Sequence, residues 1–124
     1  MRTESTRNAS AVSDANWSPP NAMVPLDAAS TIIVQEVCTE FRLTPTQLYS
    51  KSRQVRIAFG RMIAMYLCRR VTKASLPRIG DVFYRDHTTV LHAIRRIEST
   101  MIKRPMFKKA IRSISERAIG RLVL

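Results

Sequence analysis

The run from Ser75 to Glu98 constrains the fold of this chain more than any other stretch, because its pattern predicts two short helices joined by a tight turn. Ser75 is a good N-cap, and Pro77 stands in the first turn, where its missing N–H costs nothing. The pattern breaks at Tyr84 and Arg85. Before that break, apolar residues recur at helical spacing and mark a buried stripe: Ile79, Val82 and Phe83.

A second helix is expected to begin at His87, with Asp86 as its cap. Its apolar positions repeat at helical spacing: Val90, Leu91, Ile94 and Ile97. Most of its polar residues fall on the other face: His87, Thr88, His92, Arg95 and Arg96. Two helices arranged in this way form a helix-turn-helix.

The polar face of the second helix has two interpretations. In the functional one, the helix enters the major groove of duplex DNA and its first residues meet the base edges. Aspartate accepts from cytosine, the threonine methyl touches the thymine methyl, and histidine donates to guanine or phosphate. In the other, Asp86 is only a cap and the threonines are only surface. Because short helix pairs are common, the local pattern leaves both open.

The charge of the chain favours a polyanionic partner. The 124 residues are enough for one domain with a single core. They include 21 Lys and Arg against 9 Asp and Glu, a formal net charge of +12. Between Phe41 and Gly80 there are nine basic residues and no acidic one. A solvated surface usually mixes both signs, so this one-sided run indicates nucleic-acid binding.

Residues 1–26 are predicted to be a flexible tail. They are rich in Ser, Asn, Ala and Pro and contain few large apolar residues apart from Trp17, so they bury too little to offset their ordering entropy. Trp17 is either an unanchored aromatic or a residue that docks on a partner. We therefore expect the folded domain at residues 27–124.

Helical periodicity on both sides of the helix-turn-helix predicts an all-α fold, a small bundle of about six helices. Before it, helices are expected from Asp27 or Ser30 to Phe41, over residues 46–50 with Thr44 as N-cap, and over roughly 55–73. The candidate core positions of the long helix are Ile57, Ile63, Ala64, Leu67, Cys68 and Val71, with Met65 and Tyr66 flanking them.

After it, Ser99–Arg104 is expected to be a connection, and Pro105 opens a last helix. Its inward positions are predicted to be Met106, Phe107, Ala110, Ile111, Ile114, Ala118 and Leu122. This helix either packs back on the bundle or is swapped with, or bound to, a partner.

The segment from Lys51 to Arg56 is basic and lacks an apolar period, which predicts an exposed loop. Such a loop lies along phosphates or reaches into a minor groove. Several arginines of the following helix, Arg61 and Arg69 among them, are expected on its polar sides, where they meet phosphates. The alternative for any one of them is a solvated side chain.

Other classes of function find little support. Cys38 and Cys68 lack metal-ligand spacing and are expected to be buried in a reducing compartment. His87 and His92 lie about 140° apart around a helix, a poor arrangement for sharing a metal. No nucleophile stands beside Asp86 and His87, and no run is long enough to span a membrane. We expect a cytoplasmic protein that is not an enzyme and uses no cofactor, metal or small-molecule substrate.

One resemblance is specific. Arg85–Glu98, preceded by Ala64–Cys68 and Ser75–Gly80, resembles the C-terminal DNA-binding domain (domain IV) of the bacterial chromosomal replication initiator DnaA. The resemblance runs from about Ser30 to Glu98 and on through the last helix. It implies a helical domain that recognises a short asymmetric nonamer in double-stranded DNA, the DnaA box, as a monomer.

The resemblance also implies roles for residues. Arg53 would enter the minor groove, Asp86, His87 and Thr88 would read bases in the major groove, and Pro77 would lie against a base at the groove edge. The phosphate contacts that it implies are Arg61, Arg69, Leu76 through its backbone N–H, Thr89 and His92. The basic loop adds Lys51 and Arg56 as candidate phosphate contacts.

Three departures from the family pattern predict weaker or altered recognition of the box. Phe59-Gly60 stands where Arg-Pro is common, which removes a charge and adds flexibility, and Met62 stands where Gln is usual. Tyr84 stands in the turn where Gly is usual. If that position has a positive φ, a residue other than glycine costs about 1 kcal/mol or more.

The initiator is an ATPase, whereas these residues contain no GxxxxGK[ST] loop. We therefore expect a free-standing, nucleoid-associated DNA reader that regulates transcription or competes with the initiator. Two alternatives stay open. One is an interaction module that retains the fold and docks a replication or transcription protein through its last helix or Trp17, and the other is a non-specific nucleic-acid binder.

Overall fold

The computed structural model describes residues 24–123, and this part of the chain is all α-helical, as the sequence predicted. Its helices are α2 (Leu26–Phe41), α3 (Pro45–Tyr49), α4 (Val55–Thr72), α5 (Leu76–Phe83), α6 (His87–Lys103) and α7 (Pro105–Leu122). Most of the predicted tail, including Trp17, lies outside the described residues. Val24 and Leu26, which the sequence placed in that tail, are buried, so the packed unit already includes them.

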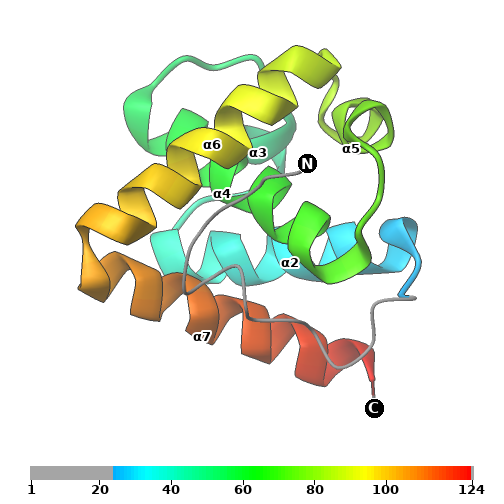
Figure 1. Cartoon of the computed structure of the whole chain (residues 1–124). Helices are drawn as coiled ribbons and strands as arrows, with labels where there is room; N and C mark the ends of the chain where they lie inside the picture. Colours follow the sequence, from blue (N-terminus) through cyan, green and yellow to red (C-terminus); the bar gives the residue numbers. More distant parts are fainter. Residues whose placement is uncertain (1–23, 124) are drawn as a thin grey trace, which may run out of the picture.

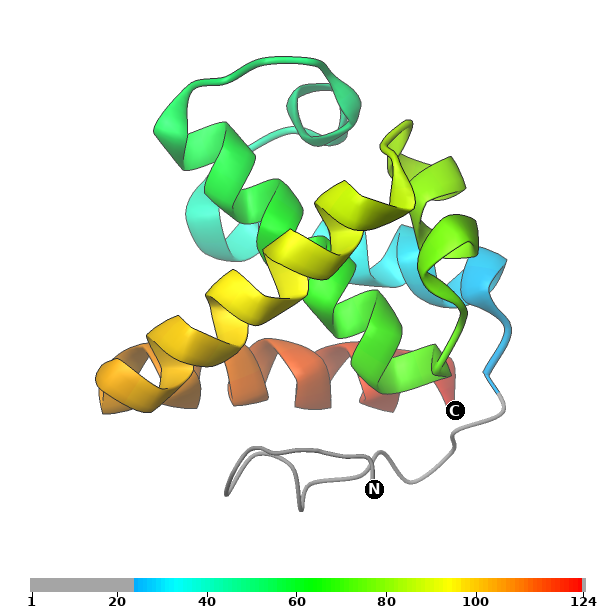
Figure 2. The same ribbon diagram turned by 45° about the horizontal axis from the view of Figure 1, so that its top comes forward.

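The long helix α4 runs through the centre of the bundle. It packs against α2 on one side and α6 on the other, and α6 crosses it in both ribbon views (Figures 1 and 2). All of its predicted core positions are buried. Met65 and Tyr66, which were expected only to flank the core, are buried as well, because neighbouring helices cover α4 on several sides.

Local capping explains where several helices begin and end. Thr44 and Gln47 form a reciprocal capping box at the start of α3, and Pro45 stands at its first residue. Helices α2, α4 and α5 each end on a residue in the left-handed region: Arg42 (φ 56°), Lys73 (φ 58°) and Tyr84 (φ 57°). The sequence placed these ends to within one residue because caps depend on neighbours in the chain.

The predicted connection at Ser99–Arg104 is wrong, because α6 continues to Lys103. Met101 is buried in the core, and this tertiary burial keeps the last turn helical. Only Arg104, with an extended backbone, separates α6 from α7. Pro105 sets this boundary, since a residue before proline is disfavoured in the helical region.

Helix α7 packs back on the bundle, mainly against α2. Its buried residues are Ile111, Ile114, Ser115, Ala118 and Ile119. Met106 was predicted to point inward and is instead 76% exposed, whereas its neighbour Phe107 packs against the core. Arg117 donates to Glu36 Oε1 at 3.0 Å and to Glu40 Oε1 at 2.9 Å. The Arg117 bond to Glu36, together with one from Arg121 to Glu36 Oε2 at 3.0 Å, holds the pKa of the Glu36 carboxyl below its ordinary value.

Both cysteines are buried, as expected, and burial raises the pKa of the Cys68 thiol to about 12. Across residues 24–123, no helix has the length and apolarity needed to cross a bilayer.

Candidate nucleic-acid interface

Helices α5 and α6 form the predicted helix-turn-helix. The Ser75 hydroxyl accepts from the Arg78 N–H at 3.3 Å at the start of α5, and Ile79 and Phe83 face the core. At the other end, the Arg85 N–H donates to the Gly80 carbonyl at 2.8 Å and closes the helix. Tyr84, Arg85 and Asp86 then carry the chain directly into α6.

Gly80 allows the two helices to approach this closely. A Cβ on Gly80 would lie 2.3 Å from the Arg85 carbonyl oxygen, closer than any real Cβ contact. The need for glycine here comes from a close backbone approach, because its φ is not positive. Gly80 therefore sets the geometry of the turn that positions α6.

The two faces of α6 are arranged as the sequence predicted. Val90, Ala93, Ile94 and Ile97 are buried against the bundle. The polar residues of the other face are exposed: His87, Thr88, Thr89, His92, Arg95 and Arg96. The first turn of α6 therefore presents an open row of hydrogen-bonding side chains.

Asp86 occupies the N-cap position of α6, but its side chain makes no capping hydrogen bond. Its carboxylate instead accepts from the Thr88 hydroxyl and lies 3.2 Å from His87 Nδ1. The Thr88 hydroxyl, with a further contribution from His87, lowers the pKa of Asp86. Asp86, His87 and Thr88 therefore form one connected, solvent-facing polar cluster at the N-terminus of α6.

The basic loop, residues 50–54, joins α3 to α4. Lys51 and Arg53 are exposed, as predicted. The base of the loop is ordered by Ser50, whose hydroxyl donates to the Gln47 carbonyl at 2.6 Å and accepts from the Ser52 N–H at 3.2 Å. The two cationic side chains therefore project from a backbone that is fixed at its root.

Arg61 corrects the sequence prediction. It was expected on an outward side of α4 as a phosphate contact, but it is only 5% exposed. Its guanidinium donates to the carbonyls of Leu48 at 2.8 Å and Ser50 at 2.7 Å, and to that of Ser52 at 3.3 Å. These donors are used within the protein, so Arg61 holds the basic loop in place.

Arg56 lies in the first turn of α4, within the helix expected over residues 55–73, and the predicted loop therefore ends before it. Its Nη2 donates to the carbonyls of Phe41 at 3.0 Å and Arg42 at 2.7 Å. Arg56 is exposed, yet its guanidinium is directed at the C-terminal end of α2. This satisfies carbonyls that the helix leaves free.

Arg69 lies in the last turn of α4, and Leu76 and Pro77 begin α5. Arg69 is exposed, and its Nη1 donates to the Ala74 carbonyl at 2.6 Å. Leu76 is the first residue of α5, where a backbone N–H has no partner within the helix, and Pro77 is exposed beside it. These candidates lie at the opposite end of α5 from the turn, so the predicted site residues form an extended surface.

A basic groove of about 550 Å³ separates the basic loop from the turn of the helix-turn-helix. It is lined by Lys51, Ser52, Arg53, Ala58, Arg61, Tyr84 and Arg85. Arg85 bridges its two sides, since its Nη2 donates to the Ser50 carbonyl at 2.9 Å. The sequence missed Arg85 as a site residue, because no local spacing signals a contact between residues 35 apart.

Comparison with known proteins places these features in a family. The model of the bacterial dnaA protein helix-turn-helix matches residues 30–97. The chain belongs to this DnaA helix-turn-helix family. This membership supports DNA binding by the domain, and the matched region covers α4, α5 and the exposed face of α6.

The similar relatives carry the name chromosomal replication initiator protein DnaA. The chain is 39% identical over 98 residues to that of Clavibacter sepedonicus, covering 78% of this chain and 20% of the relative. It is 41% identical over 90 residues to that of Leifsonia xyli subsp. xyli (72% and 19%). It therefore spans about a fifth of the length of these relatives.

A solved structure agrees with the sequence relatives. The crystal structure of a DNA replication initiation factor superimposes with a TM-score of 0.70 at 36% identity. The match covers 78% of this chain and 30% of the solved one. The DnaA domain IV fold is thus shared over most of the described residues.

The structure shows the local geometry at two of the three departures from the DnaA pattern, Tyr84 and Phe59-Gly60. Tyr84 does have a positive φ, at 57°. Gly60 is buried within continuous α4, where a Cβ would lie 2.7 Å from Leu43 Cδ1, the end of a side chain. Phe59 packs its ring against that of Phe107, with centroids 5.4 Å apart.

Proposed function

We propose that this chain binds double-stranded DNA sequence-specifically at DnaA-box-like sites and regulates replication initiation or transcription. The observation that carries this proposal is the exposed cluster of Asp86, His87 and Thr88 at the start of α6. A helix-turn-helix presents this part of its second helix to the major groove.

The cluster has the chemistry for base reading. His87 donates to a guanine or a phosphate, and the Thr88 methyl packs on a thymine methyl. The Asp86 carboxylate accepts from a cytosine amino group, and its present bond from Thr88 holds it at the tip of the helix. Arg53, exposed on the basic loop, enters the adjacent minor groove.

Contacts to DNA phosphates fix the position and orientation of the domain on the duplex. The exposed candidates are Lys51, Arg69, Thr89 and His92, together with the backbone N–H of Leu76. Arg61 and Arg56 act indirectly, because their guanidinium groups hold the basic loop and the end of α2. The net charge of +12 adds long-range attraction to DNA.

A salt titration by fluorescence anisotropy tests both parts of the proposal. With about five to eight phosphate contacts, the log–log slope of affinity against salt should be about −5 to −7, since each contact releases about 0.9 of a counterion. The duplex carrying a DnaA box should bind more tightly than a scrambled duplex at every salt concentration. Equal affinities would reject sequence-specific reading and leave a non-specific nucleic-acid binder.

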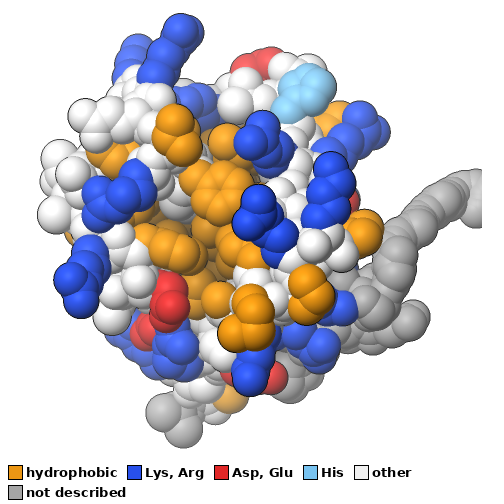
Figure 3. Space-filling view, turned by 90° about the vertical axis from the view of Figure 1, so that its left-hand side faces the viewer, with side chains coloured by type: hydrophobic (Ala, Val, Ile, Leu, Met, Phe, Trp, Pro, Cys, Tyr) orange, Lys and Arg blue, Asp and Glu red, His pale blue; other side chains and the backbone are white. Residues whose placement is uncertain are grey.

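An apolar surface favours a second candidate function, docking of a replication or transcription protein. Val55 is 83% exposed one turn before Phe59, and Met106 is 76% exposed beside Phe107. Figure 3 shows apolar side chains gathered among basic ones on one side of the molecule.

Two sets of variants separate the candidates. If DNA reading is the activity, replacing Arg53, His87 and Thr88 by alanine should abolish the effect of the protein on replication initiation or transcription in cells. If the effect survives those changes but is lost in a Val55→Ser, Met106→Ser double variant, protein docking is the activity.

A further inference from the structure

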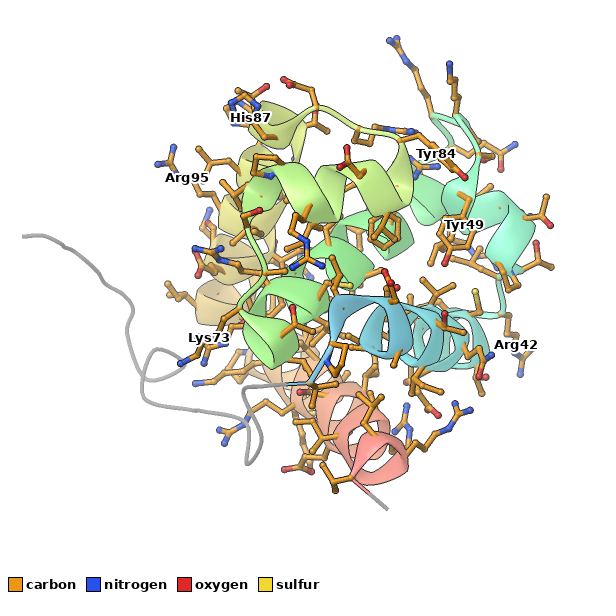
Figure 4. The ribbon with its side chains drawn as sticks, turned by 90° about the vertical axis from the view of Figure 1, so that its right-hand side faces the viewer. Arg42, Tyr49, Lys73, Tyr84, His87 and Arg95 are labelled. Atoms are coloured by element: carbon orange, nitrogen blue, oxygen red, sulfur yellow. The ribbon has the colours of Figure 1, made fainter. Side chains whose placement is uncertain are left out.

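Tyr84 occupies a costly position without contributing to the core. Its backbone has φ 57°, a region that residues with a side chain rarely adopt, and its side chain is 71% exposed. In Figure 4, Tyr84 lies at the same edge of the molecule as His87, beside the loop that rises from the end of α3. Strained residues that packing does not require are concentrated at functional sites.

The groove beside Tyr84 concentrates positive charge. Arg61 and Arg85 both donate to the Ser50 carbonyl, at 2.7 and 2.9 Å, so two guanidinium groups converge on one atom. Neither forms an ion pair with a carboxylate within residues 24–123. Lys51 and Arg53 line the same groove from the loop. Within residues 24–123 none of these four cations pairs with a carboxylate, so the groove carries a net positive charge that suits an anionic ligand, with Lys51 and Arg53 as its exposed cations.

The position of the groove identifies that ligand, given the proposed binding mode. If Arg53 reaches into the minor groove and α6 into the adjacent major groove, one sugar–phosphate strand must pass between them. The gap between the basic loop and the start of α6 is the groove that Tyr84 and Arg85 line.

We propose that this groove binds the sugar–phosphate strand that separates the two DNA grooves, and that Tyr84 is a direct contact to it. The inference rests on the proposed function. The ring packs on a deoxyribose and the hydroxyl donates to a phosphate oxygen, while Lys51 and Arg53 flank the strand. A backbone contact carries no sequence information, so Tyr84 contributes to affinity for every duplex.

Tyr84→Gly, Tyr84→Asn and Tyr84→Phe test this assignment by anisotropy titration on box and scrambled duplexes. Glycine and asparagine tolerate the left-handed backbone and remove the ring, without any change in charge. Affinity for both duplexes should fall by the same factor, about fivefold to tenfold, with an unchanged salt slope. The Tyr84→Phe variant keeps the ring, so its affinity for both duplexes should fall by a smaller factor. Thr88→Ala should instead lower affinity for the box alone.

Thermal melts separate binding from folding. Tyr84→Gly should melt at or above the wild-type temperature, because the positive φ no longer carries a Cβ. Arg42→Gly is the matched control: it has φ 56° at a helix end and does not line the groove. Arg42→Gly also removes a positive charge, so its loss of DNA affinity measures the effect of removing one cation. Tyr84→Gly, which removes no charge, should lose more affinity than Arg42→Gly.

Unchanged affinity in Tyr84→Gly, with box preference retained, would overturn the contact and leave the proposed function intact. Equal binding of both duplexes by the wild type would overturn sequence-specific reading, while the Tyr84→Gly loss on both would still support the groove contact.

Discussion

Replacing Gly80 by alanine should disturb the turn that positions α6. The new Cβ would lie 2.3 Å from the Arg85 carbonyl oxygen, and real Cβ contacts essentially never fall below 3.0 Å, so the turn must retreat by at least 0.7 Å. The Arg85 N–H donates to the Gly80 carbonyl at 2.8 Å, so the same retreat strains the bond that closes α5. We expect both stability and DNA affinity to fall.

Gly120→Ala provides the matched control. Gly120 lies in α7, and a Cβ there meets nothing within 4 Å. Replacing a helical glycine by alanine stabilises by about 0.5–1 kcal/mol, and both variants share this gain. The difference between them therefore isolates the clash at Gly80, which overpacking data place at about 1–3 kcal/mol.

Urea denaturation followed by far-UV circular dichroism measures this difference. Gly120→Ala should be more stable than the wild type and bind the box duplex equally well. Gly80→Ala should unfold at lower urea than Gly120→Ala and bind the box more weakly. Equal stabilities of the two variants would refute the claim that Gly80 is required by close backbone approach.

Three further substitutions test other parts of the structure. Arg61→Met should destabilise the fold by about 2–4 kcal/mol, because it removes charged donors from buried carbonyls, and should speed amide exchange in the basic loop; unchanged exchange there would contradict its positioning role. Thr44→Ala should cost about 1 kcal/mol in urea denaturation through loss of the capping box, and no loss would contradict the cap. Because Arg117 holds the pKa of Glu36 below 4.5, the Glu36 carboxylate stabilises the fold above that pH, and the contribution is lost as pH falls through the lowered pKa. The free energy of unfolding should therefore fall more steeply with acidification in the wild type than in Glu36→Gln, and parallel curves would contradict this pairing.

Local features of this fold were predictable from sequence. Ser75, Thr44 and Tyr84 mark helix ends through chemistry that involves only near neighbours, so the limits of α3 and α5 followed directly. The exposed face of α6 followed from its apolar spacing. The exposure of Lys51 and Arg53 followed from the absence of such spacing in the basic loop.

Contacts between distant segments were not predictable in this way. Met101 keeps α6 helical because it is buried by other elements, which its own sequence neighbourhood does not reveal. The spacing of Arg61 along α4 predicts a surface cation. In the structure, however, it is buried and donates to carbonyls up to 14 residues earlier in the chain. The same applies to Arg85, whose bond to Ser50 joins the turn to the basic loop. Hydrophobic periodicity predicts which face of a helix is apolar, but it does not predict which polar residues a distant loop will cover.

Selection of bound duplexes from a random DNA library tests the central claim most directly. Reading by one recognition helix and one minor-groove loop predicts a single asymmetric motif of about nine base pairs resembling a DnaA box, and loss of major-groove preferences in the His87→Ala, Thr88→Ala double variant. Recovery of no enriched motif, or of a motif unchanged in that variant, would contradict reading by α6.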